Sequence, residues 1–416
     1  MKTNRMNIQK SNANRPALVV FTAGAFFFYS FIQMTLFSTE AMKEYFMGLL
    51  SLETTAAFGN FAGTFLYGTV LLLIPVGLLL DKFSVKKIIL AMILLDVICI
   101  LGLTFTNDVM VASVLRFLTG VAHCAAFMAP FRIAPRWFPS RQLALVSGLL
   151  VAFAVFGGWV SGAPLLGLII SFGGKTAMLI NTGLGVVILV VAALLLKDFP
   201  ENFKAESSIE NNISLVQSLK LAAKNKQNWL SGLYIGLLNL AVLLLGAMWG
   251  TTYLKIVNPE FSEATYTGII GMIFIGTIIG SPLSGLISDK LKSRKKAMVG
   301  GGILSLVVML LIMFPPSTGA TMFYVLFLLL GIITAAQSIG YPVIGESNED
   351  KILGTANGLA AVVLMGMGAI GQPLFGKLVD VFGGTTEAFQ KAIWVMPIAF
   401  IGAIVCAVLL KETFKK

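Results

Sequence analysis

The chain has 416 residues, of which 57% are hydrophobic and only 12% are charged, and its formal net charge is +11. Soluble domains usually carry about 25% charged residues, so this composition excludes a single water-soluble core and indicates a membrane protein. The basic residues lie in short loops between apolar runs and not in one patch, which argues against a nucleic-acid partner.

Twelve apolar runs are long enough to form spanning helices, which need about 20 residues each. The basic N-terminal segment leads into a first run that is longer than the hydrophobic region of a signal peptide, so we expect an uncleaved first span. The sequence therefore predicts an all-α polytopic membrane protein with twelve transmembrane helices. In chain order, the predicted spans cover residues 17–38, 56–80, 87–106, 109–131, 142–170, 176–196, 228–254, 265–288, 297–314, 320–344, 354–379 and 390–411.

A polar segment of mixed charge divides these spans into six and six. We predict an N-terminal six-helix bundle at 1–196, a cytoplasmic linker with a short surface helix at 197–228, and a C-terminal six-helix bundle at 229–416. The predicted inner segments hold 24 Lys and Arg residues against five in the outer loops. By the positive-inside rule, this imbalance predicts that both termini are cytoplasmic, in a bacterial inner membrane.

Two sequence features recur in the two halves. GLLLDKFSVKK at 77–87 and GLISDKLKSRKK at 285–296 both end the second span of a half. GAPLLGLIISFGG at 162–174 and GQPLFGKLVDVFGG at 371–384 both close the fifth span. Matched positions at a nearly constant offset indicate a duplicated six-helix unit, which is one of the known transporter architectures.

The first repeated loop resembles a motif of the major facilitator superfamily, Gly-x-x-x-Asp-Arg/Lys-x-Gly-x-Arg/Lys. It matches this pattern at Gly77, Asp81 and Lys86, while Ser84 stands where the family has glycine. The resemblance implies two pseudo-symmetric six-helix bundles that move relative to each other. It also implies a gating role for this loop, because a carboxylate at a helix end can pair with a cation or with helix N–H groups in one state and release them in the other.

The second copy of the loop matches the same pattern at Gly285, Asp289 and Arg294, with Lys292 in place of the glycine. The fourth span adds an Arg-x-x-x-Gly pattern at Arg116 and Gly120, which is also similar to the family. The alternative interpretation of the basic residues in both loops is that they only set the topology.

Three titratable residues lie inside predicted spans, where a charged group costs roughly 2.5–3.5 kcal/mol on insertion scales. They are Asp96 on the third span and Arg116 and His123 on the fourth. The depths of Asp96 and Arg116 overlap, which predicts an ion pair that either fixes helix packing or takes part in transport. His123 is the only histidine, and it serves either as a proton carrier or as a neutral hydrogen-bonding group.

Spans one, four, seven and ten line the cavity in the family that this chain resembles. That resemblance selects Tyr29, Gln33, Arg116, Asn239 and Gln337 as candidates for the substrate or proton pathway, together with His123. Hydrogen bonding between helices is the alternative role of a polar side chain inside a span.

Other classes of protein fit the sequence less well. With one histidine, no two-histidine metal site can form, and no catalytic residue, metal or cofactor is predicted. No segment resembles a channel selectivity filter. A membrane sensor without transport activity stays open as an alternative.

The candidate polar residues include one cation and few acids, which favours a zwitterionic or anionic solute. Phrases in the first half resemble bacterial nutrient-uptake members of the phagosomal type, which implies import of an amino acid, nucleoside or organic acid. We therefore predict a proton-coupled importer that acts as a monomer in the lipid bilayer. A drug or siderophore exporter driven by proton antiport is the alternative.

Overall fold

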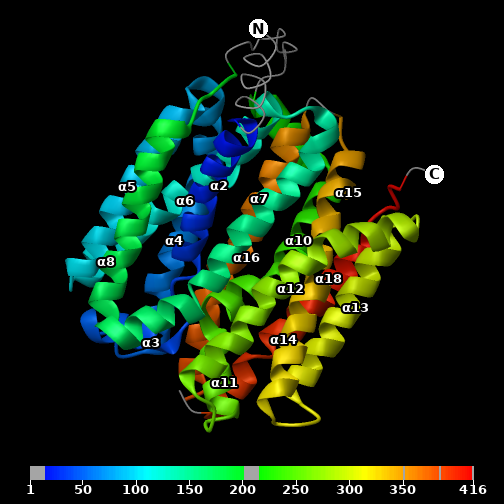
Figure 1. Cartoon of the computed structure of the whole chain (residues 1–416). Coiled ribbons are helices and arrows are strands. Elements are labelled where there is room, and N and C mark those ends of the chain that lie inside the picture. The colour runs from blue at the N-terminus through cyan, green and yellow to red at the C-terminus, as the bar shows by residue number, and fades with distance from the viewer. Residues whose placement is uncertain (1–14, 201–214, 350–351, 384–385, 415–416) are drawn as a thin grey trace, which may run out of the picture.

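The computed structural model describes residues 15–200, 215–349, 352–383 and 386–414. Within these ranges the chain is helical, with short connections and no strands. Figure 1 shows long helices running side by side between two ends of the molecule. We call the end near Arg15 and Glu412 the terminal end, and the opposite end, which carries the short helix α3, the distal end.

The first half of the chain contains seven helices in the described residues. They are α2 (Arg15–Met34), α3 (Glu40–Leu49), α4 (Thr55–Lys82), α5 (Val85–Phe105), α6 (Val109–Trp137), α7 (Ser140–Val160) and α8 (Ala163–Leu195). The helix α9 (Leu215–Lys224) lies within the predicted linker. Residues 201–214 of that linker lie outside the described residues, and the predicted domain boundaries remain a prediction.

The second half repeats this arrangement with more interruptions. Its elements are α10 (Lys226–Leu240), the π-helix η1 (Ala241–Trp249), α11 (Gly250–Val257), α12 (Glu263–Lys290), α13 (Arg294–Met313), α14 (Ala320–Thr334), the 3₁₀-helix η2 (Ala335–Ile339), α15 (Gly340–Glu346), α16 (Leu353–Val381), α17 (Thr386–Ala392) and α18 (Val395–Leu409). Thus the predicted seventh span is α10, η1 and α11 in series, and the tenth is α14, η2 and α15.

Eleven stretches of the described chain are long and apolar enough to cross a membrane, and one of them is Leu145–Leu195 with 51 residues. At 1.5 Å per residue this stretch is about 76 Å long, more than twice the ~30 Å thickness of the hydrocarbon layer. It reverses at Gly173, whose backbone has a φ of +80°. The stretch therefore accounts for two crossings, and the predicted twelve-helix, all-α fold is confirmed.

The predicted fifth span, 142–170, is wrong in detail. The helix α7 ends at Val160, and α8 begins at Ala163 after Gly162, whose φ of −84° and ψ of −110° are not helical. Pro164 lies in the first turn of α8, where its missing N–H costs nothing. The matching segment in the second half stays within the continuous helix α16, so the two copies of this repeat differ in backbone shape.

The FGG ending of the repeat nevertheless has the same role in both halves. Gly173 and Gly383 are the two glycines with positive φ in the described residues, at +80° and +96°. A side chain would be strained at either position, which explains why glycine occurs where each fifth span ends.

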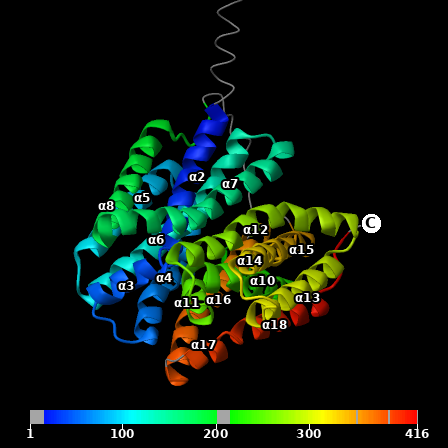
Figure 2. The same ribbon diagram turned by 60° about the horizontal axis from the view of Figure 1, so that its bottom comes forward.

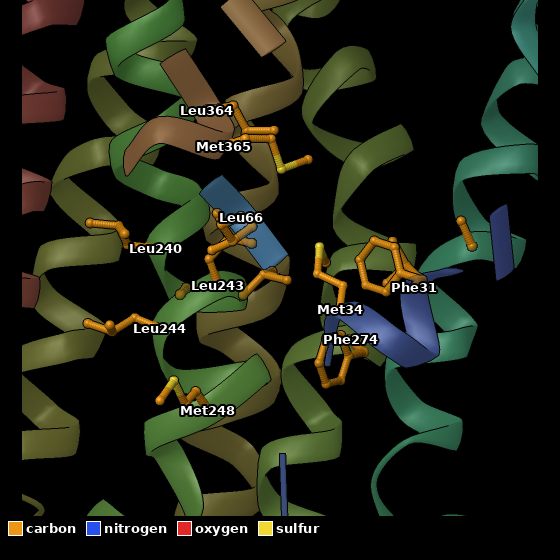
Figure 3. Packing of buried hydrophobic residues seen from close by; sticks show 14 of the residues in the cluster. Phe31, Met34, Leu66, Leu240, Leu243, Leu244, Met248, Phe274, Leu364 and Met365 are labelled. Carbon is orange, nitrogen blue, oxygen red and sulfur yellow. The ribbon is translucent and has the colours of Figure 1, made fainter. Parts of the chain in front are cut away.

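Helices of the two halves pack against each other most extensively in two places. Figure 2 shows α2 to α8 grouped apart from α10 to α18, with α4 against α16 and α7 against α12 between the groups. At the centre of this interface lies a cluster of apolar side chains from both halves, including Leu66 of α4 and Leu243 of η1 (Figure 3). An added Cβ at Gly368 of α16 would touch both of these leucines, so the halves are in close contact at this level.

Within the first half, α4 and α6 pack backbone to backbone at Gly120. A Cβ atom at this position would collide with the carbonyl oxygen of Phe65. The carbonyl oxygen of Gly120 also accepts a hydrogen bond of 3.0 Å from the Thr69 hydroxyl. This close approach requires glycine and gives the Arg-x-x-x-Gly pattern a structural role.

Candidate functional site

The predicted pathway residues of the first half lie in a buried polar core between α2, α5, α6 and α8. Gln33 of α2 and Asn181 of α8 form a reciprocal amide pair, with N–O distances of 3.1 and 3.0 Å. Both side chains are almost fully buried. The Gln33 amide therefore joins two helices in this state, which is the structural role expected of a buried amide in a membrane bundle.

Arg116 lies beside this pair. Its Nη1 atom donates a 2.7 Å hydrogen bond to the Gln33 carbonyl oxygen, and its guanidinium carbon lies 4.8 and 4.9 Å from the ring centres of Phe65 and Phe37. The residue is 1% exposed, and its Nε atom has no hydrogen-bond partner among the described residues. Two aromatic faces thus hold a buried cation that keeps free donor capacity.

The predicted ion pair between Asp96 and Arg116 is not formed in this structure. Asp96 of α5 is fully buried, and neither of its carboxyl oxygens has a hydrogen-bond partner in the described chain. The hydroxyl of Tyr29, a third predicted residue, is also buried and unpartnered. The depths of Asp96 and Arg116 along their helices do overlap, but the Arg116 side chain turns to the Gln33 carbonyl and the phenyl rings instead.

His123 lies about two helical turns after Arg116 on α6, among aromatic rings. Its Nδ1 atom shares a 2.8 Å hydrogen bond with the Ser30 hydroxyl, and Nε2 has no partner among the described residues. The rings of Phe27, Phe65 and Phe127 lie 5.3–6.4 Å away. In this state the imidazole joins α6 to α2, and its role in proton transfer remains a prediction.

The candidates of the second half occur where the helices are irregular. Asn239 lies two residues before η1, and Gln337 lies within η2. Both are half-buried, and neither side chain takes part in a hydrogen bond within the described part of the chain. Short π- and 3₁₀-segments inside long helices are frequent at functional sites and hinges, and the sequence pattern gave no sign of either.

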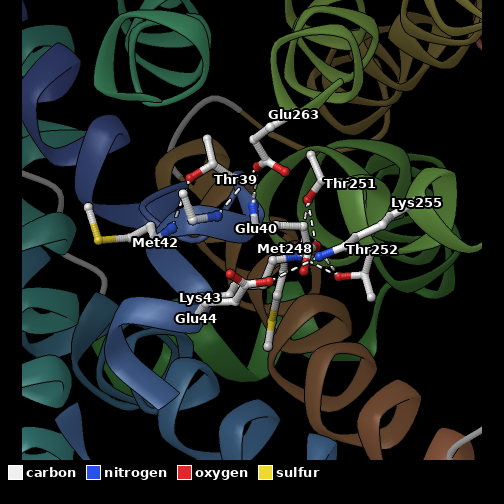
Figure 4. Close-up of polar contacts among 11 residues, drawn as sticks. Thr39, Glu40, Met42, Lys43, Glu44, Met248, Thr251, Thr252, Lys255 and Glu263 are labelled. Atoms are coloured by element: carbon white, nitrogen blue, oxygen red, sulfur yellow. Dashed lines mark hydrogen bonds and ion pairs between the residues drawn. The ribbon is translucent and has the colours of Figure 1, made fainter. Parts of the chain in front are cut away.

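A charged network at the distal end, which no sequence pattern indicated, joins the two halves. Lys43 of α3 pairs with Glu40 and donates to the Met248 carbonyl oxygen at 2.8 Å and to the Thr251 hydroxyl at 3.0 Å (Figure 4). Thr252 contacts both charged groups. Glu40 and Lys43 belong to the first half and the other three residues to the second, so this network bridges the halves.

The charges in this network are buried, with Glu40 7% and Lys43 3% exposed. Burial raises the pKa of the Glu40 carboxyl, but the Lys43 charge and the hydrogen bonds it receives lower it more, so its pKa lies below the ordinary 4.5. Burial also lowers the pKa of the Lys43 ammonium, against the opposing effect of Glu40. Both shifts mean that the closed network binds protons less readily than the separated groups do.

Three further contacts join the halves at the distal end. Glu263 of α12 accepts hydrogen bonds from the backbone N–H of Glu40 at 2.9 Å and of Ala41 at 3.4 Å. Asp380 of α16 accepts one from the backbone N–H of Ala56, in the first turn of α4, at 2.7 Å. An exposed ion pair between Lys255 and Glu44 lies 3.0 Å apart. These contacts come from segments more than 200 residues apart, so no local pattern indicates them.

At the terminal end, the repeated loops form polar contacts within each half. In the first half, Asp198 accepts hydrogen bonds from the Ser84 hydroxyl and from the backbone N–H of Lys86, at the start of α5. Lys86 also donates to the Ala193 carbonyl oxygen. Gly77 lies against Met128 of α6. The side chain of Asp81 lies outside the described residues, so its predicted gating contact stays a prediction.

The second half contains an equivalent cluster. Glu412 accepts hydrogen bonds from the Ser293 hydroxyl and from the backbone N–H of Arg294, at the start of α13. Arg294 also pairs with Asp289 at 2.6 Å and with Glu346 at 3.0 Å. The predicted Asp289 and Arg294 thus meet, and Glu346 and Glu412 are partners that the sequence motif did not reveal.

The two repeated loops differ in backbone conformation where the motif lacks its glycine. Lys292 has a φ of +48°, in the left-handed region, whereas Ser84 has a φ of −57°. Only the second turn therefore needs the conformation that glycine provides. Gly285 faces open space, with no atom within 4 Å of an added Cβ.

Comparisons with known proteins agree on one family. A family model described as the Major Facilitator Superfamily matches residues 19–363 and 252–415. A protein of Agrobacterium vitis named "Putative tartrate transporter" is 26% identical over 86% of this chain and 85% of its own length. The "Probable sulfoacetate transporter SauU" of Cupriavidus necator is 21% identical over 81% and 82%.

Among solved structures, a bacterial homologue of the human lysosomal transporter Spinster, in an inward-facing and unoccupied conformation, is similar to this chain. The TM-score is 0.74 with 13% sequence identity, covering 95% of this chain and 96% of the other. At this level of identity the likeness shows the fold alone.

Proposed function

We propose a function from one premise, which is that the chain belongs to the Major Facilitator Superfamily. Its relatives over most of its length are named as transporters, which supports a secondary transporter. We propose that it imports a small solute with an anionic group, an organic acid or a zwitterionic amino acid, by alternating access and together with protons. We further propose that it acts as a monomer in a bacterial inner membrane, with the terminal end in the cytoplasm.

One observation carries the alternating-access part of this proposal. The described hydrogen bonds and ion pairs at the distal end connect the two halves, whereas the clusters around Asp198 and Glu412 at the terminal end each stay within one half. Contacts that lock the two halves together at the distal end, as seen in the described residues, are what one stage of a rocking cycle requires. The predicted topology places the terminal end in the cytoplasm, so the locked distal end faces the outside, and this stage is closed to the outside.

The anionic character of the proposed solute rests on Arg116. A guanidinium is a bidentate partner for a carboxylate or sulfonate, and this one keeps an unpartnered Nε atom between two phenyl rings. The names of the two relatives reported above refer to organic anions, which supports the same class of solute for this chain. We infer that the solute displaces the contact of Arg116 with the Gln33 carbonyl oxygen.

Uptake of radiolabelled tartrate into proteoliposomes, beside a panel of amino acids and monocarboxylates, tests this function. Arg116→Gln should weaken uptake by about 10- to 150-fold at sub-saturating solute, since a hydrogen bond to a charged group contributes about 1.5–3 kcal/mol. Lys391→Gln is the matched control, because it removes an exposed cation whose ion pair with Glu387 is local. Equal uptake by wild type and Arg116→Gln would refute the role of Arg116, and no uptake of any anion or zwitterion would refute the solute class.

A further inference from the structure

Among the described acids of the first half, Asp96 is the buried one whose carboxyl group has no hydrogen-bond partner. It is fully buried on α5, eleven residues after this 21-residue helix begins at Val85, and both oxygens lack a hydrogen-bond partner in the described chain. An ionised carboxylate at mid-membrane depth without a donor costs several kcal/mol. A neutral carboxyl group costs far less, so this environment favours the protonated form.

Few charged or titratable groups act on Asp96 from the helices around it. In the described residues they are Arg116 from α6, Tyr29 from α2 and Cys99 from α5 itself, and α4 and α8 contribute none. On the α8 side, the side chain of Tyr29 lies against Gly185, and the Asn181 amide is already used by Gln33. Within the described part of the chain, Arg116 is therefore the cation placed to act on Asp96.

Three unsatisfied polar groups from three helices share this region. They are the Asp96 carboxyl, the Tyr29 hydroxyl and the Nε atom of Arg116. Buried polar groups in native proteins nearly always have partners, and each exception calls for an explanation. A second arrangement of the same groups explains why they lack partners here. An ionised Asp96 could take Arg116 as its partner once Arg116 releases the Gln33 carbonyl oxygen.

We propose that Asp96 is the proton-binding site of this chain and that it competes with the solute for Arg116. In the distally closed state Asp96 is protonated, and Arg116 binds either the Gln33 carbonyl oxygen or an anionic solute. When the solute leaves, Arg116 pairs with Asp96, and the carboxyl proton passes to water on the side to which the site is open. One proton is bound and released per cycle, and no covalent bond changes. This inference rests on the proposed transport function.

The competition makes two binding events depend on each other. A solute anion on Arg116 removes the partner that would stabilise ionised Asp96, so it favours protonation of Asp96. By reciprocity, protonation of Asp96 strengthens binding of the anion by the same factor. If one proton binds with each anion, the apparent Kd of the anion should rise about tenfold per pH unit above the pKa of Asp96.

The proton site is tested first without any solute. Infrared spectra of the full-length protein in liposomes, recorded across a pH series, should show the carbonyl stretch of a protonated carboxyl at neutral pH. This band should disappear in Asp96→Asn, which keeps the shape of the side chain. The matched control is Asp108→Asn, an exposed carboxylate at the N-cap of α6, where asparagine caps equally well. An Asp96→Asn spectrum identical to that of the wild type would overturn the proposal.

Calorimetric titration with tartrate at several pH values tests the coupling. The Kd should rise about tenfold per pH unit in the wild type and in Asp108→Asn, and it should be independent of pH in Asp96→Asn. The same pH slope in all three proteins would overturn the competition for Arg116. If the infrared band depends on Asp96 but no anion binds, the proton site stands and the proposed solute class fails, so the two failures are distinguishable.

Discussion

Replacing Lys43 by methionine is expected to open the distal end of the molecule. Methionine keeps most of the apolar stem but removes the ammonium group that joins Glu40 to Met248 and Thr251 of the other half. The Glu40 carboxylate, which is 7% exposed, is then left buried without its counter-charge. Removing one partner of a buried ion pair costs about 3–5 kcal/mol. Because the network exists only when the halves meet, this cost falls on the closed state and shifts the closed-to-open ratio by roughly two to four orders of magnitude.

Pulsed electron spin resonance between two spin labels measures this shift. Glu53 and Glu260 are suitable label sites, because they are exposed at the distal end of different halves. Lys43→Met should move the distance distribution from one short population to a longer one. Lys255→Met is the control: its ion pair with Glu44 is exposed, so its loss should cost less than about 1 kcal/mol. Unchanged distances in Lys43→Met, or an equal shift in Lys255→Met, would refute the role of the buried network. The native cysteines are replaced beforehand; they are Cys99, Cys124 and Cys406.

The pH dependence of the same distances gives an independent check. The pKa of Glu40 lies below its ordinary 4.5 in the closed state. Its stabilisation of closure is therefore complete above about pH 4.5 and is lost as the pH falls through the lowered pKa. Acidification in this range should lengthen the distances in the wild type. Glu40→Gln has no proton to gain there, so its response in this range should be smaller.

Three further predictions concern the architecture, and thermal unfolding in detergent measures all of them. Lys292→Gly should stabilise the protein by up to about 1 kcal/mol, because it relieves a φ of +48°; a lower midpoint would contradict this. Gly120→Val should prevent stable folding, since its Cβ meets the Phe65 carbonyl oxygen, whereas Gly285→Ala should be tolerated; equal midpoints would contradict the close contact. Asp198→Ala should cost about 1 kcal/mol, because it removes the hydrogen bonds that Asp198 accepts at the start of α5, and an unchanged midpoint would refute it.

The sequence predicts the span count and the duplication because both depend on local composition. Apolar length sets the crossings, and a glycine such as Gly173 or Gly383 marks a turn that other residues cannot make without strain. The break after Val160 was not predicted, because residues 142–170 read as one apolar run and hydropathy does not register a local change of direction.

The contacts of the candidate site were harder to predict. Sequence position gives the depth of Asp96 and Arg116 in the membrane but not the direction in which each side chain points around its helix axis. Sequence position therefore does not distinguish an ion pair with Asp96 from the observed contact between Arg116 and the Gln33 carbonyl oxygen. The Glu40–Lys43 pair is visible as an i, i+3 spacing, but its partners on η1 and α11 depend on how the halves dock.

The duplication has preserved a capping arrangement and not a sequence. At the start of the third predicted span of each half (α5 and α13), a serine caps the helix. A carboxylate from beyond the last helix of that half accepts hydrogen bonds from the serine hydroxyl and from a backbone N–H. The acid is Asp198 in one half and Glu412 in the other. Unpaired backbone N–H groups and the helix dipole attract a carboxylate at the start of a helix, and either the shorter aspartate or the longer glutamate side chain can supply it. Because these bonds close within a half, they make each half rigid without opposing rotation between the halves. The buried charges at the distal end have the complementary property, since every bond from Lys43 to the second half must break before that end can open.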